Sequence, residues 1–430
     1  MNTEDAKVTI YYGSDDTPIE NLTIPKGTVQ TVHLSEDNSN HRMLVLDDNS
    51  SNASTVVQRK GFRIVSTQPI TAYQFNTLRK TAVYNDALLL LPKNVYGNKY
   101  YNVIGSTSGT GITTGYSYIA IQATSPGTTN FKITPSVNTL SGRNDTNSST
   151  IDAYTANRTY DYALQQYDVF QVTANADMTG TRVTADKPFV AIAGCPSCYN
   201  AVKMSSDVYD HYSEQLFPYQ SWGSEYALGG FKKQGSERDQ YRIVVVEDTQ
   251  LTITPQISTY NHSQIGGTTP ITLHAGDVYD IVTSASFHMK ANKPILVAGF
   301  LGDEGTDKDP SYMLVVPVQQ FRSDYSFMIP AKFSENIITI TAPQDLTSVV
   351  VTKTDTGTKQ TINASQFTKI PSTNYMYYHL SIGSTASMTA DQPYTIVADK
   401  PIGLQSYGYT HQSSYAYPLG LNLIKLNLSN

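Results

Sequence analysis

The sequence predicts an all-β protein built from tandem β-sandwich-like units of about 100 residues. Nearly every apolar segment alternates or forms a short β-branched run, as at residues 337–341 and 348–352, and ends close to Gly, Pro, Asn or Asp. No convincing helix exceeds two turns, and the best candidate is a turn at residues 206–216 before Pro218. Two repeated phrases set the size of the unit.

The first phrase is Ala-Asp/Asn-Lys-Pro before an apolar run. It occurs at 185–188, 291–294 and 398–401, with a weaker Ser-Thr-Gln-Pro copy at 66–69, so the copies lie roughly 110 residues apart. Proline fixes φ and lacks an N–H, so it starts a strand better than it continues one. The preceding Asp or Asn can close a corner through its own backbone. Each copy therefore predicts a turn into a buried strand, with Asp186 and Asp399 in structural roles.

A second phrase, Pro-x3-aromatic-x3-Tyr, keeps step with the first and starts at Pro92, Pro218 and Pro317. Two phrases recurring in one order indicate internal duplication. The predicted units are 1–85, which is divergent, then 86–205, 206–310 and 311–430. The alternative is a β-propeller with two four-stranded blades in each unit. The polar stretch 139–157 is expected to be a long exposed loop.

The composition argues against several classes of partner. Charged residues make up 15% of the 430 residues, the net charge is −6, and there is no Lys/Arg run. Nucleic acid and anionic membranes are therefore not expected partners, because both need clustered cations. No apolar segment reaches the ~18 residues of a membrane span, and the polar first residues show no signal peptide. The 31 tyrosines suit strands and extracellular binding surfaces equally.

The two cysteines, Cys195 and Cys198, are the disulfide candidate. A CxxC pair can be redox-active, but it then opens a helix in a βαβ setting, which this sequence lacks. A zinc site would need two more ligands, and Asp210 and His211 are the nearby ones. We expect a local disulfide or two free thiols.

Two acidic clusters could suggest a metal. If 206–216 were helical, Asp207, His211 and Glu214 would share a face, where capping a turn is the simpler role. A Gly-containing loop also carries Glu304 among further acidic residues that suit calcium, although no EF-hand spacing is present. These calcium candidates are Asp303, Asp307 and Asp309. No other cofactor is expected. No nucleophile elbow or phosphate loop occurs, so no catalytic residue can be assigned and the chain is not expected to be an enzyme.

Residues 210–218 with 222–223 resemble a signature of the IgGFc-binding protein N-terminal domain family. Phrases at 177–181, 194–195, 309–313 and 407–420 fall in the order that the family shows, so the resemblance covers roughly 60 to 420. The signature residues, expected to be structural, are Asp210, His211, Gln215, Pro218, Trp222, Gly223, Asp309 and Pro310.

The resemblance implies an extracellular or cell-surface, non-enzymatic β module, of the kind found beside von Willebrand factor type D or other adhesive domains. Fc binding belongs to some members and is not transferred here. Family members carry a cysteine just before Asp-His, where this chain has Tyr209. A long-range disulfide is therefore not expected.

These observations predict an adhesion or recognition module that binds a protein or glycan. The alternatives are a self-associating component of a surface layer or fibre, and an accessory domain of a carbohydrate-active enzyme. Tyrosine rings can stack on sugars, but each tyrosine could equally pack in the core. The contact candidates, if exposed, are Tyr100, Tyr101, Tyr116, Tyr118, Tyr375, Tyr377 and Tyr378.

Overall fold

A computed structural model gives the fold as all-β, as predicted, with short 3-10 turns between strands. The helical turn predicted at 206–216 is wrong. Asp210–Gln215 form strand β16, because they pair antiparallel with β15 (Phe189–Cys198). The structure describes residues 4–13, 16–34, 55–77, 85–105, 115–198, 210–232, 238–260, 264–267, 269–301, 310–330, 333–383, 392–410 and 413–427.

The third unit shows the repeat most simply, as two antiparallel sheets that share one long strand. We label its strands A to G in chain order. One sheet has the order D-C-F-A and the other the order E-B-F-G. The strands are A, β17 (Gly223–Leu228); B, β18 (Asp239–Val245); C, β19 (Thr249–Thr254); D, β20 (Ile271–Leu273); E, β21 (Val278–Thr283); F, β22 (Phe287–Phe300); and G, β23 (Tyr312–Leu314).

Apolar side chains of both sheets meet in one core, to which β17, β18 and β19 contribute Tyr226, Ile243 and Ile253. Two sheets that face each other over a shared core form a sandwich, which is the fold predicted from the sequence.

The fourth unit repeats this strand order around its own core. Its A to G strands are β24 (Arg322–Met328), β25 (Glu335–Pro343), β26 (Ser348–Lys353), β27 (Lys359–Asn363), β29 (Tyr375–Ile382), β30 (Pro393–Thr410) and β31 (Ser413–Pro418), and β28 (Thr368–Lys369) adds to the E edge.

The second unit has the same order, with strand F divided into β14 and β15. Its A to G strands are β7 (Lys99–Tyr101), β8 (Ser117–Ala123), β9 (Thr129–Thr134), β12 (Tyr160–Leu164), β13 (Val169–Ala174), β14 (Arg182–Ala185) with β15, and β16.

The stretch 139–157 is not the long exposed loop that its polarity suggested. It contains β10 (Gly142–Asn144) and β11 (Ser149–Ile151), which extend the second unit's sheet through β3 (Thr55–Gln58). The fold is stabilised here by Tyr154, which is buried and stacks on Tyr160 at 4.2 Å between ring centroids. Polar residues at the sheet surface hid this apolar anchor.

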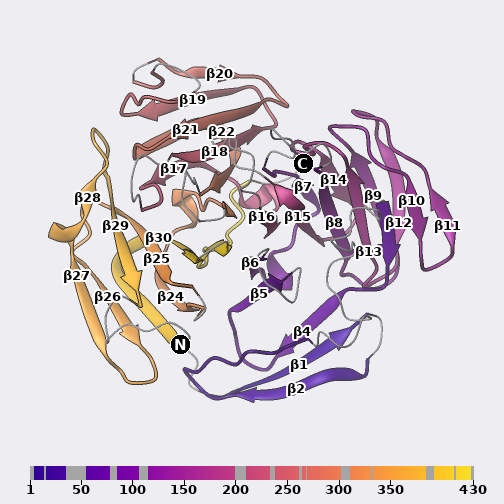
Figure 1. The fold of residues 1–430 in the computed structure, drawn as a ribbon, viewed down its shortest axis with the longest axis horizontal. Coiled ribbons are helices and arrows are strands. Elements are labelled where there is room, and N and C mark those ends of the chain that lie inside the picture. The colour runs from indigo at the N-terminus through magenta and orange to yellow at the C-terminus, as the bar shows by residue number, and fades with distance from the viewer. Residues whose placement is uncertain are drawn as a thin grey trace.

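The first unit has fewer strands among its described residues. β1 (Ala6–Tyr12), β2 (Pro18–Ile24) and β4 (Phe62–Ser66) form one sheet, and β5 (Ala72–Thr77) pairs with β6 (Asn85–Leu90). Figure 1 shows the four units around a common centre.

The Ala-Asp/Asn-Lys-Pro phrase marks the point where strand F passes from one sheet to the other. In β22, Phe287–Ala291 pair with A and C, whereas Ile295–Phe300 pair with B and G. The acidic or amide side chain holds the crossing by accepting backbone N–H groups at the start of strand C, rather than by closing a corner on its own backbone alone. The bonds are Asn130 N–H to Asp186 (2.9 Å), Gln250 N–H to Asn292 (2.8 Å) and Thr347 N–H to Asp399 (3.0 Å).

The second phrase supports the same crossing from strand A. Its proline opens a 3-10 turn, and its last tyrosine is buried with its hydroxyl donating to the carbonyl just after the F-strand proline. The turns are η3 (Lys93–Val95), η4 (Tyr219–Ser221) and η5 (Val318–Gln320), and η6 (Ala364–Gln366) lies elsewhere. The hydroxyl bonds are Tyr100 to Phe189 (2.8 Å), Tyr226 to Ile295 (2.6 Å) and Tyr325 to Ile402 (2.5 Å).

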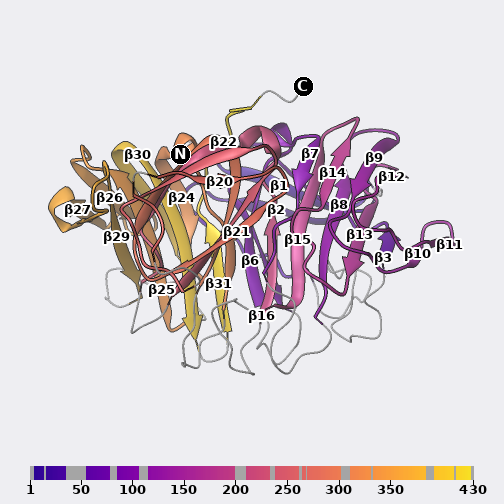
Figure 2. The same cartoon turned by 90° about the horizontal axis from the view of Figure 1, so that it is seen from above.

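The G strands of the four units meet in the middle of the molecule, where β6, β16 and β31 stand between the outer sheets (Figure 2). β6 also contacts β31, and β23 contacts β16 and β31. The unit boundaries remain a prediction. Each predicted boundary lies at or before a G strand that pairs with the F strand preceding it. Among the described residues, no helix is long and apolar enough to cross a membrane.

Replacing Asp399 with Ala should lower the free energy of unfolding by about 1 kcal/mol, because two strand-C amides lose their acceptor. Asp399→Asn should cost much less, since Asn292 already fills this position in the third unit. Urea denaturation of both variants measures this difference. Equal losses in the two variants would contradict the proposed acceptor role.

Candidate functional site

The signature residues that carried the family resemblance lie at the centre of the molecule and are buried. Gln215 accepts the Leu91 N–H of the first unit at 3.0 Å. The Trp222 indole donates to Phe217 O at 3.1 Å. A Cβ on Gly223 would lie 2.3 Å from Pro317, so a larger residue would not fit there.

Two other signature residues, Asp210 and Pro310, meet strand β31. The hydroxyl of Ser414 donates to Pro310 O at 2.8 Å and lies 3.5 Å from the Asp210 carboxylate. These contacts join units to one another, and none of them forms an open ligand site. Asp309 lies outside the described residues.

Cys195 and Cys198 form a disulfide with each other, which settles the choice between paired and free cysteines. Both are buried where the β15–β16 pairing shifts register. The cysteine sulfurs are bonded to each other and so are not thiolate ligands for zinc.

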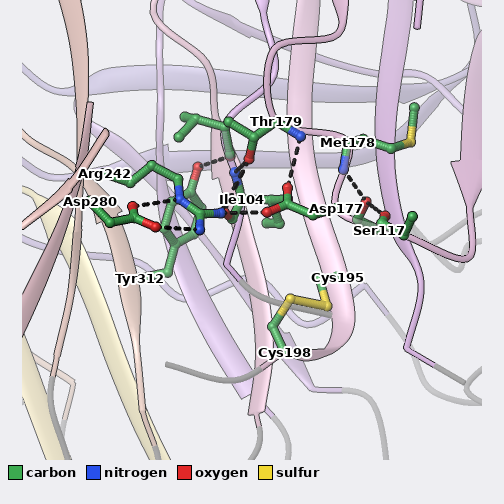
Figure 3. Close-up of polar contacts among 12 residues, drawn as sticks. Ile104, Ser117, Asp177, Met178, Thr179, Cys195, Cys198, Arg242, Asp280 and Tyr312 are labelled. Carbon is green, nitrogen blue, oxygen red and sulfur yellow. Dashed lines mark hydrogen bonds and ion pairs between the residues drawn. A yellow bond between two sulfur atoms is a disulfide. The ribbon is translucent and has the colours of Figure 1, made fainter. Parts of the chain in front are cut away.

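A buried arginine joins the second and third units (Figure 3). Arg242, on β18, forms ion pairs with Asp280 at 2.9 Å and with Asp177 at 2.6 Å, and donates to the Ile104 carbonyl at 2.6 Å. Burial alone would lower the pKa of Arg242, but hydrogen bonds and charges of the two aspartates raise it above its ordinary value. The family phrase at 177–181 thus contributes to an interunit ion-pair cluster.

Arg242→Met should lower the free energy of unfolding by about 2–3 kcal/mol, because it leaves two half-buried carboxylates without their cation. The matched control is Arg322→Met, since Arg322 pairs with Asp324 at the surface and should cost under about 1 kcal/mol. Denaturant unfolding measures both variants. A loss no larger than the control's would show that the ion-pair cluster does not hold these units together.

Two buried carboxyl groups face each other beside the central strands. Asp86 accepts the Ser213 N–H at 2.7 Å, and Glu214 accepts the Leu314 N–H at 3.3 Å. Burial, followed by the charge of Asp86, raises the pKa of Glu214 well above its usual value. Burial also raises the pKa of Asp86. Burial lowers the pKa of His211 to about 4, so this histidine is neutral at physiological pH.

These shifts predict how stability depends on pH. A protonated Glu214 stabilises the fold fully below its unfolded pKa of 4.5, and the contribution is lost as the pH rises toward the raised folded-state pKa. Glu214→Gln mimics the protonated form. Between pH 5 and 8, the wild type should lose stability relative to this variant by up to about 1.4 kcal/mol per pH unit.

Chemical denaturation across this pH range measures the difference between the two proteins. His211 is common to both, so its own titration cancels. A difference that stays constant from pH 5 to 8 would contradict the raised pKa of Glu214.

The structure places the seven candidate tyrosines in different environments. Tyr100 and Tyr118 are buried in the core and so are not surface contacts. Tyr101 is half-buried against Trp222, Tyr377 packs on Gly229, and Tyr378 lies near Phe367. Tyr116 is also half-buried. Tyr375 alone among the seven lines one of the two best-formed surface hollows.

That hollow is a polar groove of about 290 Å³ between the third and fourth units. Glu225 on β17 and His288 on β22 form one wall, with His288 Nε2 2.8 Å from Glu225 Oε1. Tyr375, at the start of β29, closes the other wall by donating to Glu225 at 3.0 Å and stacking on the His288 ring at 5.2 Å. The remaining lining residues are Thr254, Lys290, Ser372, Thr373 and Asn374.

The groove combines one aromatic ring with charged and hydrogen-bonding groups, which suits a polar partner. Burial, and then the charge of Glu225, raise the pKa of Tyr375 above its ordinary value, so its hydroxyl stays protonated. Sequence reasoning found Tyr375 but missed Glu225 and His288. No local motif marks them, because they are 63 residues apart and meet across paired strands.

A larger hollow of about 590 Å³ lies over the second unit. Its polar groups already pair with one another, Lys132 with Asp161 at 2.8 Å and Asn130 with Asp186 at 2.6 Å, so it offers fewer free contacts. Within the part of the chain that the structure describes, no group of three metal-ligating side chains occurs. The calcium candidates Asp303, Asp307 and Asp309 lie outside those residues, and calcium remains a prediction.

Fold and site together define a class of protein, an all-β module of packed sandwiches with a polar groove between two of its units. A family model described as "IgGFc binding protein" matches residues 86–408. The chain therefore belongs to the IgGFc-binding protein family, as its resemblance suggested. A human protein named IgGFc-binding protein is 26% identical over 259 residues, which is 59% of this chain and 4% of that relative. No solved structure matches the chain significantly.

Proposed function

We propose that this chain is an extracellular recognition module that binds a protein or glycan without catalysis. Family membership supports the protein-binding class. The observation that carries the proposal is the groove of Glu225, His288 and Tyr375, in which two rigid units present fixed polar groups beside an aromatic ring.

The groove is suited to holding a partner in one orientation. Its side chains project from strands rather than from long loops, so little side-chain ordering is needed on binding. Lys290 and Glu225 supply opposite charges, and Asn374 supplies an amide. An aromatic face beside such groups can pack against either a sugar ring or an apolar side chain.

The proposal is tested by binding of the whole chain to a glycan array and to an immobilised IgG Fc fragment, the latter because the human relative's name refers to IgG Fc. We expect saturable binding to at least one probe. Tyr375→Ala should weaken that binding at least tenfold, about 1.4 kcal/mol, because it removes both the ring and the hydroxyl bond to Glu225.

The matched control is Tyr260→Ala, at an exposed tyrosine outside the groove, which should bind like the wild type. Binding unaffected by Tyr375→Ala would place the contact elsewhere. Failure of every probe, together with ordered polymers in light scattering, would favour an assembly role.

A further inference from the structure

The first unit is an incomplete copy of the sandwich. Its strands β1, β2 and β4 take positions C, D and the first half of F, and β5 and β6 take the second half of F and G. Among the described residues of this unit, no strand takes position A or B. Position E corresponds to residues 28–34, which follow Gly27 (φ +71°) as β21 follows Gly276 (φ +95°).

Position B is in the middle of a sheet and not at its margin. In the other three units, strand B lies between E and the second half of F, pairing with both. Residues 28–34 have no strand assignment, and β5 pairs with β6 alone among the described strands. A strand edge with unpaired backbone groups is a template for another strand.

Burial shows that the interior of this unit is open. Ile64, Ile70 and Phe75 are 41%, 38% and 41% exposed. Counted from the proline of the first phrase, the same positions in the other units are fully buried wherever the residue is large and apolar. These residues are Val183, Met289 and Ile396 for Ile64; Phe189, Ile295 and Ile402 for Ile70; and Phe300 and Tyr407 for Phe75, each 0% exposed.

The core of the first unit is correspondingly small. Its buried apolar residues are Ala6, Val8 and Ile10, all on β1. In the third unit, strand B alone contributes Tyr241 and Ile243 to the core, along with Val245. The position left open is therefore the one that supplies apolar side chains to the middle of a complete sandwich.

We infer that the first unit binds an extended strand of a partner polypeptide, which takes position B antiparallel to β5. The three B strands of this chain define the chemistry of that strand, a short β-branched or aromatic run such as Asp239–Val245. Backbone pairing gives affinity, and apolar side chains cover Ile70 and Phe75. This surface is distinct from the groove at Tyr375 and does not depend on the function proposed for it.

The test is titration of the whole chain with a fluorescein-labelled peptide of the β18 sequence, Asp239–Val245, followed by fluorescence anisotropy. We expect saturable binding and slower amide hydrogen exchange in β5. The matched control is the same peptide with Ile243→Pro, which removes a ladder N–H and should not bind. No saturable binding, or equal binding of both peptides, would overturn the inference.

Variants locate the site on the chain. Ile70→Lys should weaken peptide binding at least tenfold, whereas Val397→Lys, at an exposed valine on β30 whose neighbours are both present, should leave it unchanged. Ile64→Lys is the second variant, should Ile70→Lys fail to fold. Peptide binding that both lysines at Ile64 and Ile70 leave intact would overturn the proposed position.

Two further outcomes are informative. A dimer that forms with rising concentration and that the peptide dissociates would place a second copy of this chain in position B, and would overturn assignment to a partner protein. Wild-type glycan or Fc binding by Ile70→Lys would leave the Tyr375 groove unaffected, so the two proposals fail independently.

Discussion

One constraint organises this molecule, namely that a single strand in each unit belongs to two sheets. Strand F must leave the first sheet and enter the second without leaving buried amides unpaired. The proline supplies the turn, the Asp or Asn side chain accepts N–H groups of strand C, and the tyrosine of strand A donates to the carbonyl beyond the proline. Two sheets held at this crossing can face each other and bury one core.

The crossing also directs each F strand toward the centre, where the G strands meet. There the units are joined by buried polar groups, such as Asp86 with the Ser213 amide and Arg242 with Asp177. Such groups are stable in the interior because each finds a partner in another unit. The interunit contacts fix the third unit against the fourth, and so fix Glu225 beside Tyr375.

The first unit lacks part of this arrangement, and its surface differs accordingly. Its F strand still pairs with C and G, but the side chains that should face strands A and B lie in solvent. Exposed apolar residues beside a strand edge are unfavourable in isolation. A chain that combines three closed sandwiches with an open one thereby has a rigid body and one surface with a built-in preference for extended polypeptide.

The sequence by itself determined the strands, the repeat and the points at which sheets change, because alternation, proline and turn residues act over a few positions. It could not distinguish buried Tyr100 from groove-lining Tyr375, since strands buried on both faces lose the alternation that would separate them. It also misjudged 206–216, where polar residues that suggested a helical turn pair as a central strand. Only the tertiary structure decided which distant charges meet, as with Arg242 and Asp177 or Glu225 and His288, because those contacts depend on how whole units pack.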